Sequence, residues 1–175
     1  MQIEQASLIR GWMGGAELTW LAEQAERHSK IVEIGSFLGR SCRVLADNTT
    51  GEVTAVDTWD IAHPAYGDIT HLFDEFCDNM AGCDNLRAVR QRSLDAAVSL
   101  RLEKFDMIFI DADHSYEAVK ADILAWRVLL TPDGLICGHD YDEDGVRRAV
   151  NEMLPEAKLE VGSIWASNLT SAAEI

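Results

Sequence analysis

The sequence is 175 residues long, with 47% hydrophobic and 26% charged residues, which is typical of a single globular domain over residues 1–175. Its 30 acidic and 15 basic residues give a formal net charge of −15, which argues against binding to nucleic acid, because phosphates need a basic surface. The N-terminus has no signal-peptide pattern and no apolar run approaches bilayer length, so we expect a cytoplasmic protein without membrane contact.

Hydrophobic periodicity predicts helices that alternate with short strands. Residues 1–29 are expected to form N-terminal helices, because apolar residues recur at helical spacing after the Gly14-Gly15 pair. Residues 58–70 contain proline and glycine and are expected to form a loop. The expected strands are residues 30–35, 53–57, 86–91, 105–111 and 135–138, and the other expected helices are residues 40–47, 71–80, 94–102, 115–130 and 146–153.

The order of these elements predicts an α/β fold with a mostly parallel sheet and helices on both faces. Two further strand-like runs, residues 158–161 and 164–169, are separated only by Gly162 and Ser163, which is a hairpin length. Because parallel neighbours need a long crossover, this hairpin must add an antiparallel strand. The expected architecture is therefore a Rossmann-like, doubly wound, seven-stranded sheet with an antiparallel C-terminal hairpin strand.

Acidic residues recur where the predicted strands end. Glu33, Asp57, Asp111 and Asp140 all lie at or just beyond the carboxyl end of a strand. Ligands of open α/β sheets bind beyond that edge. One acid at a strand end is ordinary, but four on the same rim indicate a ligand-binding site.

The segment VEIGSFLGRS, residues 32–41, places Gly35 directly after a strand and Gly39 at the start of a helix. Small residues and free N–H groups there let a ligand approach the backbone, although glycines also serve tight turns for steric reasons alone. The spacing differs from the G-x-G-x-x-G of dinucleotide-binding proteins, so pyrophosphate binding is the weaker interpretation. Asp57 stands where a carboxylate can accept both hydroxyls of a ribose, and the alternative is a helix cap or a solvated strand end.

The segments VEIGSFLGRS, AVDTW, FIDADHSYEAVKADILAW, GLICGHDY and GVRRAV, in this order, resemble class I S-adenosylmethionine-dependent methyltransferases. The most similar subgroup is that of small bacterial O-methyltransferases with DxDHSY and HDY signatures, and the resemblance covers residues 30–167. It implies methyl transfer from S-adenosyl-L-methionine to a small-molecule acceptor, expected to be a hydroxyl. The cofactor-binding residues that it implies are Glu33, Gly35, Ser36, Phe37, Gly39, Ser41, Asp57, Thr58, Trp59, Ser93, Leu94, Asp111 and Ala112.

The resemblance also implies a site for a divalent cation. In metal-dependent relatives the acid after the fourth strand and a polar pair after the fifth hold the cation, and these positions are Asp111, His139 and Asp140 here. Mg²⁺ or another divalent cation would lower the pKa of an acceptor hydroxyl. His139 replaces an acid of catechol-type relatives, so His139 and His114 are both candidates for a general base, with Asp140 as the third expected catalytic residue. In the alternative without metal, Asp111 orients the cofactor and the residues after it cap the next helix.

Two other function classes fit parts of the sequence. An NAD-dependent oxidoreductase would use a related sheet, but the missing G-x-G-x-x-G and the final hairpin disfavour it. A non-catalytic module, either a degenerate methyltransferase or a calcium-binding protein, is suggested by residues 140–151, which nearly match a calcium loop. Asn151 stands where that loop requires a bidentate glutamate, and a strand precedes the segment where a helix is required.

The chain has no obvious insertion for binding the acceptor. The N-terminal residues 1–29 and the 58–70 loop are the segments that could form a lid. Trp12 and Trp20 could instead pack the interface of a homodimer.

Overall fold

The computed structural model describes residues 1–60 and 71–168, so most of the expected 58–70 loop lies outside the described residues. The helices are α1 Glu4–Leu8, α2 Gly15–Ala25, α3 Arg40–Asn48, α4 Leu72–Asn79, α5 Ser93–Ser99, α6 Tyr116–Trp126 with the short 3-10 helix η1 Arg127–Leu129, and α7 Asp144–Met153. The strands are β1 Lys30–Ile34, β2 Glu52–Asp57, β3 Leu86–Arg90, β4 Phe105–Ile110, β5 Leu130–Gly138, β6 Lys158–Val161 and β7 Ile164–Asn168. None of the helices in the described ranges is long and apolar enough to cross a membrane.

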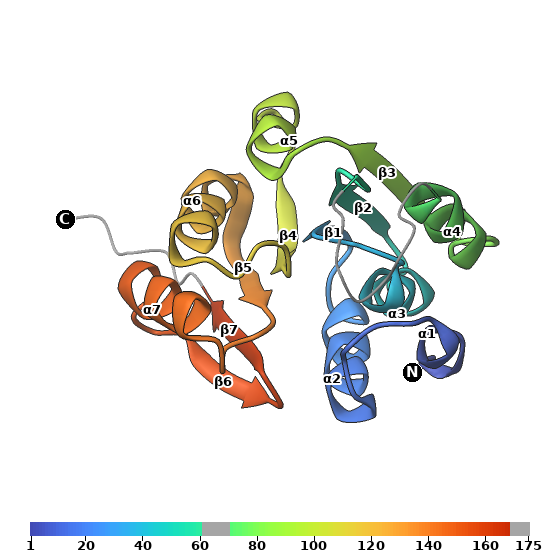
Figure 1. Ribbon diagram of the computed structural model, residues 1–175, viewed down its shortest axis with the longest axis horizontal. Coiled ribbons are helices and arrows are strands. Elements are labelled where there is room, and N and C mark those ends of the chain that lie inside the picture. Colours follow the sequence, from blue (N-terminus) through green and yellow to red (C-terminus); the bar gives the residue numbers. More distant parts are fainter. Residues whose placement is uncertain (61–70, 169–175) are drawn as a thin grey trace.

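Seven strands of the described residues form one sheet in the order β3-β2-β1-β4-β5-β7-β6 (Figure 1). Strands β1 to β5 pair in parallel, whereas β7 pairs antiparallel with both β5 and β6. The turn between β6 and β7 contains Gly162 at φ +57°, a left-handed conformation that favours glycine. The predicted doubly wound, mostly parallel sheet with an antiparallel C-terminal hairpin is therefore confirmed.

Helices cover both faces of the sheet, with α1 to α4 on one side and α5 to α7 on the other (Figure 1). Successive side chains of a strand point to opposite faces, so Ile31 packs in the core with α2 and α3 while Val32 packs in the core with α5 to α7. Full burial of one such side chain contributes about 1.5–3 kcal/mol to stability. The two cores hold the sheet rigidly beneath the loops that leave the carboxyl ends of its strands.

Helix α6 begins where the sequence changes from the apolar strand β4 to the DADHSY segment. The Ser115 hydroxyl accepts a hydrogen bond from the Ala118 N–H at 3.4 Å, and the Asp113 carboxylate accepts one from the Ser115 N–H at 2.7 Å. Ser115 is thus the N-cap of the helix, and Asp113 holds the turn before it. These two acceptors are engaged in local structure, as one interpretation of this segment predicted.

Residues 131–134, which the sequence predicts as the turn before β5, fall within the bounds of that strand. The sequence predicts that residues 131–134 end the helix and that pairing starts at Leu135, but β5 already begins at Leu130, opposite Phe105. The register then shifts, so residues 131–134 leave the regular ladder, with Asp133 at φ +62°. Leu130 alone pairs with β4 before the turn residues. One paired residue is too short a run to be recognised as a strand from sequence.

Candidate active site

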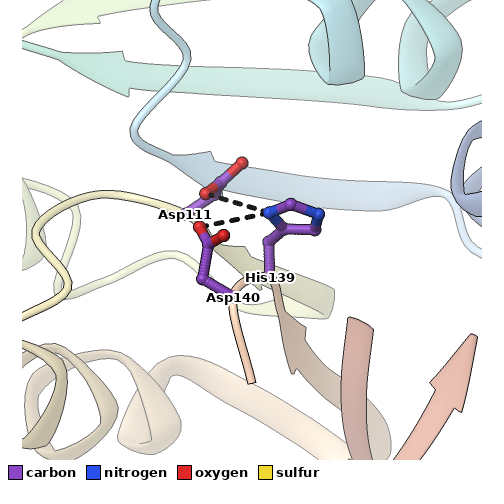
Figure 2. A group of neighbouring side chains, drawn as sticks. All are labelled: Asp111, His139 and Asp140. Atoms are coloured by element: carbon purple, nitrogen blue, oxygen red, sulfur yellow. Dashed lines mark ion pairs between the residues drawn. The ribbon is translucent and has the colours of Figure 1, made fainter. Parts of the chain in front are cut away.

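Three polar side chains meet where the neighbouring strands β4 and β5 end (Figure 2). Asp111 directly follows β4, and His139 and Asp140 directly follow β5. The Nδ1 atom of His139 lies 3.1 Å from Asp140 Oδ2 and 3.9 Å from Asp111 Oδ1. One ligand-type atom from each residue lies within 4.8 Å of the others. The structure thus brings the three predicted metal-ligating residues together.

The charged groups of this cluster shift one another's pKa. Burial lowers the pKa of His139, but the carboxylates of Asp140, Asp111 and Glu17 outweigh burial and raise that pKa to about 9. Burial raises the pKa of Asp111 to about 6, with His139 opposing the shift and Asp140 adding to it. Burial would also raise the pKa of Asp140, but hydrogen bonds from His114 and His139 hold it below its usual range. The carboxylates therefore favour positive charge at the centre of the cluster.

Asp140 joins two imidazoles through one oxygen. Its Oδ2 lies 3.0 Å from His114 Nε2 and 3.1 Å from His139 Nδ1. The Asp140 backbone has φ +58°, a left-handed conformation that aspartate tolerates better than most residues and that is common at functional sites. The side chain of His114 is 46% exposed, and that of His139 is 7% exposed. His114 is therefore the imidazole that a small molecule can reach.

The loop after β1 bends sharply at the same edge of the sheet. Gly35 has φ +88°, and a Cβ atom there would lie 2.1 Å from the backbone oxygen of Asp111, so only glycine fits between the ends of β1 and β4. Gly39 is the N-cap of α3, also at φ +88°. Between these glycines, Phe37 has φ +45° and donates its N–H to Asp57 Oδ2 at 2.8 Å. The predicted G-x-x-x-G segment is thus a tightly bent loop tied to the end of β2.

Asp57 holds the loops that follow β1 and β2. Its Oδ2 accepts from the Phe37 N–H and its Oδ1 accepts from the Trp59 N–H, both at 2.8 Å. The Trp59 indole donates from Nε1 to the Phe37 carbonyl at 2.7 Å, and its ring is buried against Phe73 and Phe76. Trp59 therefore supports the loop from within. Each carboxylate oxygen has two lone pairs, so Asp57 keeps acceptor capacity for ligand hydroxyls.

Buried polar atoms without a partner gather beside these loops. Among the described residues, the buried side-chain atoms that lack a hydrogen bond are both carboxylate oxygens of Glu33 and the hydroxyls of Ser36 and Thr58. Burial raises the pKa of Glu33 to about 7, and the nearby hydroxyls of Ser36 and Ser41 offset this effect only in part. Leaving such a group unpaired costs about 1–3 kcal/mol, so each one needs an explanation. All of these residues are among the predicted cofactor-binding positions.

The remaining predicted cofactor positions differ in accessibility. The Ser93 hydroxyl donates to Asp122 Oδ1 at 2.5 Å and accepts from an indole of α6 at 2.9 Å, so it is engaged within the protein. Leu94 beside it is 48% exposed. Ala112 is exposed after the end of β4, and Ser41 is buried in the first turn of α3.

Residues 32–141 match a family model described as a methyltransferase domain. The matched range contains the bent loop after β1, Asp57 and the cluster at the ends of β4 and β5. The chain belongs to the methyltransferase domain family.

Solved structures of O-methyltransferases share the fold of this methyltransferase domain. The O-methyltransferase from Bacillus cereus, in complex with SAH, is 21% identical and has a TM-score of 0.66 over 94% of this chain and 86% of that chain. TomG from Streptomyces achromogenes, an O-methyltransferase involved in tomaymycin synthesis and solved with SAM, is 18% identical and has a TM-score of 0.70 over 91% of this chain and 82% of that chain.

A curated relative also shares sequence with the methyltransferase domain. The protein y4gI of Sinorhizobium fredii, described as uncharacterized, is 32% identical over 131 residues, which is 70% of this chain. The chain spans only 14% of the length of that relative.

Glu17 of the methyltransferase domain was not among the predicted site residues, yet its Oε1 lies 3.1 Å from His139 Nε2. Burial would raise the pKa of Glu17, but N–H groups of Ser163 and Gly14, together with His139, lower it. A glutamate three residues after Gly14 is a capping signal that predicts a helix start. No local pattern reveals its contact with a residue 122 positions away.

Proposed function

We propose that this protein is an S-adenosylmethionine-dependent methyltransferase that methylates a hydroxyl of a small molecule in the cytoplasm. Membership of the methyltransferase domain family supports methyl transfer. The O-methyltransferases of the same fold, solved with SAM or SAH, support this cofactor and a hydroxyl acceptor. The net charge of −15 supports a small-molecule acceptor over a nucleic acid.

The observation that carries the cofactor assignment is the set of buried, unpaired polar atoms at Glu33, Ser36 and Thr58. These atoms lie near the carboxyl ends of β1 and β2, where ligands of doubly wound sheets bind. The ammonium group of the methionine part would pair with Glu33, and its positive charge would favour the ionised carboxylate. Asp57 would accept the ribose hydroxyls with its remaining lone pairs. The residues present therefore fit S-adenosylmethionine.

The donor set at the ends of β4 and β5 fits a divalent cation. Asp111 and Asp140 offer carboxylate oxygens and His139 offers Nδ1, with ligand-type atoms within 4.8 Å of one another. Carboxylates suit Mg²⁺ and Mn²⁺, whereas imidazole also suits softer transition metals. When bound, the cofactor supplies the electrophilic methyl group, and the cation would lower the pKa of the acceptor hydroxyl.

The chain's own residues would orient the acceptor and remove its proton. We assign His139 as a metal ligand, because its side chain is 7% exposed and its Nε2 is already engaged by Glu17. We assign His114 as the general base, because it is half-exposed and its Nε2 is held by Asp140. Methyl transfer is an in-line displacement, so a fixed orientation of these groups contributes directly to the rate.

Neither alternative function class is favoured. The final hairpin, which inserts β7 between β5 and β6, disfavours an NAD-dependent oxidoreductase. In the calcium-loop candidate, residues 140–151, helix α7 already begins at Asp144, so the later ligand positions lie on a helix rather than in a loop.

Asp57→Ala tests the cofactor assignment. We expect this change to weaken SAH binding at least about tenfold, because a hydrogen bond to a charged group contributes about 1.5–3 kcal/mol and because the loops at Phe37 and Trp59 lose their anchor. Titration calorimetry with SAH measures the affinity. Asp106→Ala is the matched control, since Asp106 also accepts from two backbone N–H groups, those of Ser29 and Lys30 before and at the start of β1. Equal SAH affinity in both variants would contradict the assignment.

A further inference from the structure

Glu17 reaches the candidate metal site from the N-terminal helix α2. Its two carboxylate oxygens have different partners. Oε2 accepts from the Gly14 N–H at 2.7 Å and so caps α2. Oε1 accepts from the Ser163 N–H at 3.0 Å and lies 3.1 Å from His139 Nε2. With a side chain only 12% exposed, Glu17 joins α2, the β6–β7 turn and the end of β5.

The hairpin turn leaves room for this carboxylate. A Cβ atom on Gly162 would lie 2.2 Å from Glu17 Oε1, so a side chain there would displace the glutamate. The Ser163 hydroxyl completes the environment, since it donates to Glu17 Oε1 at 3.3 Å and lies 2.9 Å from His139 Nε2. The geometry of the turn thus holds Oε1 against the imidazole.

This contact keeps a hydrogen on Nε2 of His139, whether or not Nδ1 also carries the hydrogen that it donates to Asp140 in the absence of a cation. An ionised carboxylate only accepts hydrogen bonds, so the imidazole presents Nε2–H to Glu17. The opposite nitrogen, Nδ1, then faces Asp140 at 3.1 Å and Asp111 at 3.9 Å (Figure 2). In metal sites a carboxylate that accepts from the distal N–H of a histidine fixes the ring orientation and tautomer of that ligand.

We propose that Glu17 is the positioning residue of the metal site: it holds the proton of His139 on Nε2 and thereby directs the Nδ1 lone pair at a divalent cation bound with Asp111 and Asp140. This inference rests on the metal assignment of the proposed function. It gives helix α2 a role inside the site, because α2 supplies the carboxylate that orients His139, the ligand directly after β5. Loss of a group that orients a metal ligand typically costs about 10–100-fold in metal affinity.

Glu17→Gln separates positioning from helix capping. Glutamine has a single side-chain oxygen, and if that oxygen keeps the Gly14 cap, the NH₂ group faces His139 and favours the opposite tautomer, with its hydrogen on Nδ1. A role limited to capping would leave both the tautomer and the metal affinity unchanged. Glu23→Gln is the matched control, because it removes the same charge from the same helix.

The experiment measures Mn²⁺ affinity by calorimetry and by electron paramagnetic resonance, and the tautomer of His139 by long-range ¹H–¹⁵N correlation spectra of the Mg²⁺-saturated protein. We expect Glu17→Gln to bind Mn²⁺ about 10–100-fold more weakly than the wild type, with Glu23→Gln unchanged and with Nε2–H observed in the wild type. Glu17→Asp is a second variant that keeps the charge but is too short to serve both partners, and it should lose affinity as well. Thermal unfolding checks that each variant is folded.

Two results would overturn the inference in different ways. If the wild type binds Mn²⁺ and both Glu17 variants bind it equally well, Glu17 is not a positioning residue. If the wild type takes up neither Mn²⁺ nor Mg²⁺, the metal assignment fails and this inference fails with it, while SAH binding still tests the methyltransferase assignment independently.

Discussion

Replacing Glu33 by Gln is expected to stabilise the unliganded protein by about 3 kcal/mol at alkaline pH and to weaken its binding of SAH at the same time. Glu33 is fully buried, and neither of its oxygens has a hydrogen-bond partner among the described residues. Ionising such a group costs free energy, whereas a neutral amide of similar shape avoids that cost. A substitution that raises stability but weakens ligand binding is typical of a residue whose role is to bind the ligand rather than to stabilise the fold.

The direction of the pH dependence follows from the raised pKa of Glu33. Burial raises that pKa from 4.5 to about 7, so between these values the folded protein holds a proton that the unfolded chain has released. The free energy of unfolding of the wild type therefore falls as the pH rises through this range, and the contribution is fully lost above about pH 7. The variant lacks this titration, so the difference between the two proteins should grow from near zero around pH 4.5 to its full size at alkaline pH.

Urea unfolding of the wild type and of Glu33→Gln at several pH values, without ligand, measures this difference. Glu23→Gln controls for the loss of one carboxylate as such. Parallel pH profiles of the wild type and Glu33→Gln would show that the Glu33 carboxylate is not held uncharged in the folded protein.

Replacing Asp140 is expected to remove divalent cation binding, and two substitutions separate the side chain from the backbone. Asp140→Asn keeps a residue that tolerates the left-handed φ of +58° but removes the carboxylate that contacts His114 and His139. Asp140→Ala removes the carboxylate and also imposes a left-handed backbone on alanine, which costs about 1–2 kcal/mol. Loss of a residue that only orients a ligand typically weakens metal binding about 10–100-fold. Because Asp140 is itself a proposed ligand, both variants should lose more Mn²⁺ affinity than that.

Calorimetry with Mn²⁺ and thermal unfolding together distinguish the two contributions. Equal losses of Mn²⁺ affinity in both variants, with a lower unfolding temperature for Asp140→Ala than for Asp140→Asn, are the expected pattern. Asp113→Asn is the control, because Asp113 lies in the neighbouring loop but its oxygen bonds the Ser115 backbone. Mn²⁺ affinity that survives in Asp140→Asn would show that this carboxylate is not a ligand.

The fold could be predicted in detail because its signals are local and repeated. Alternating apolar runs and helical periodicity located the strands β1 to β4 and the helices between them, and the two-residue gap at Gly162 and Ser163 required an antiparallel partner. The error lay at β5, where Leu130 resumes pairing before a turn. A single paired residue has no periodicity, so its place in the sheet depends on tertiary contact alone.

Sequence could predict the residues of the candidate site only where the order of the strands in the sheet brings those residues close together. Asp111, His139 and Asp140 follow two neighbouring parallel strands, so the strand-end rule places them side by side. Glu17 enters from another part of the chain, and its role depends on a contact that sequence spacing does not encode. The burial of the Trp59 ring likewise follows from packing on Phe73 and Phe76 rather than from the AVDTW pattern that drew attention to it.

Titration calorimetry of the wild-type protein with SAH and with NAD⁺ tests the central claim most directly. If Glu33, Ser36, Asp57 and Thr58 form the binding site for S-adenosylmethionine, SAH should bind with one-to-one stoichiometry and NAD⁺ should give no measurable heat under the same conditions. Binding of NAD⁺ in place of SAH would contradict the account, and so would SAH binding that is unaffected by Asp57→Ala.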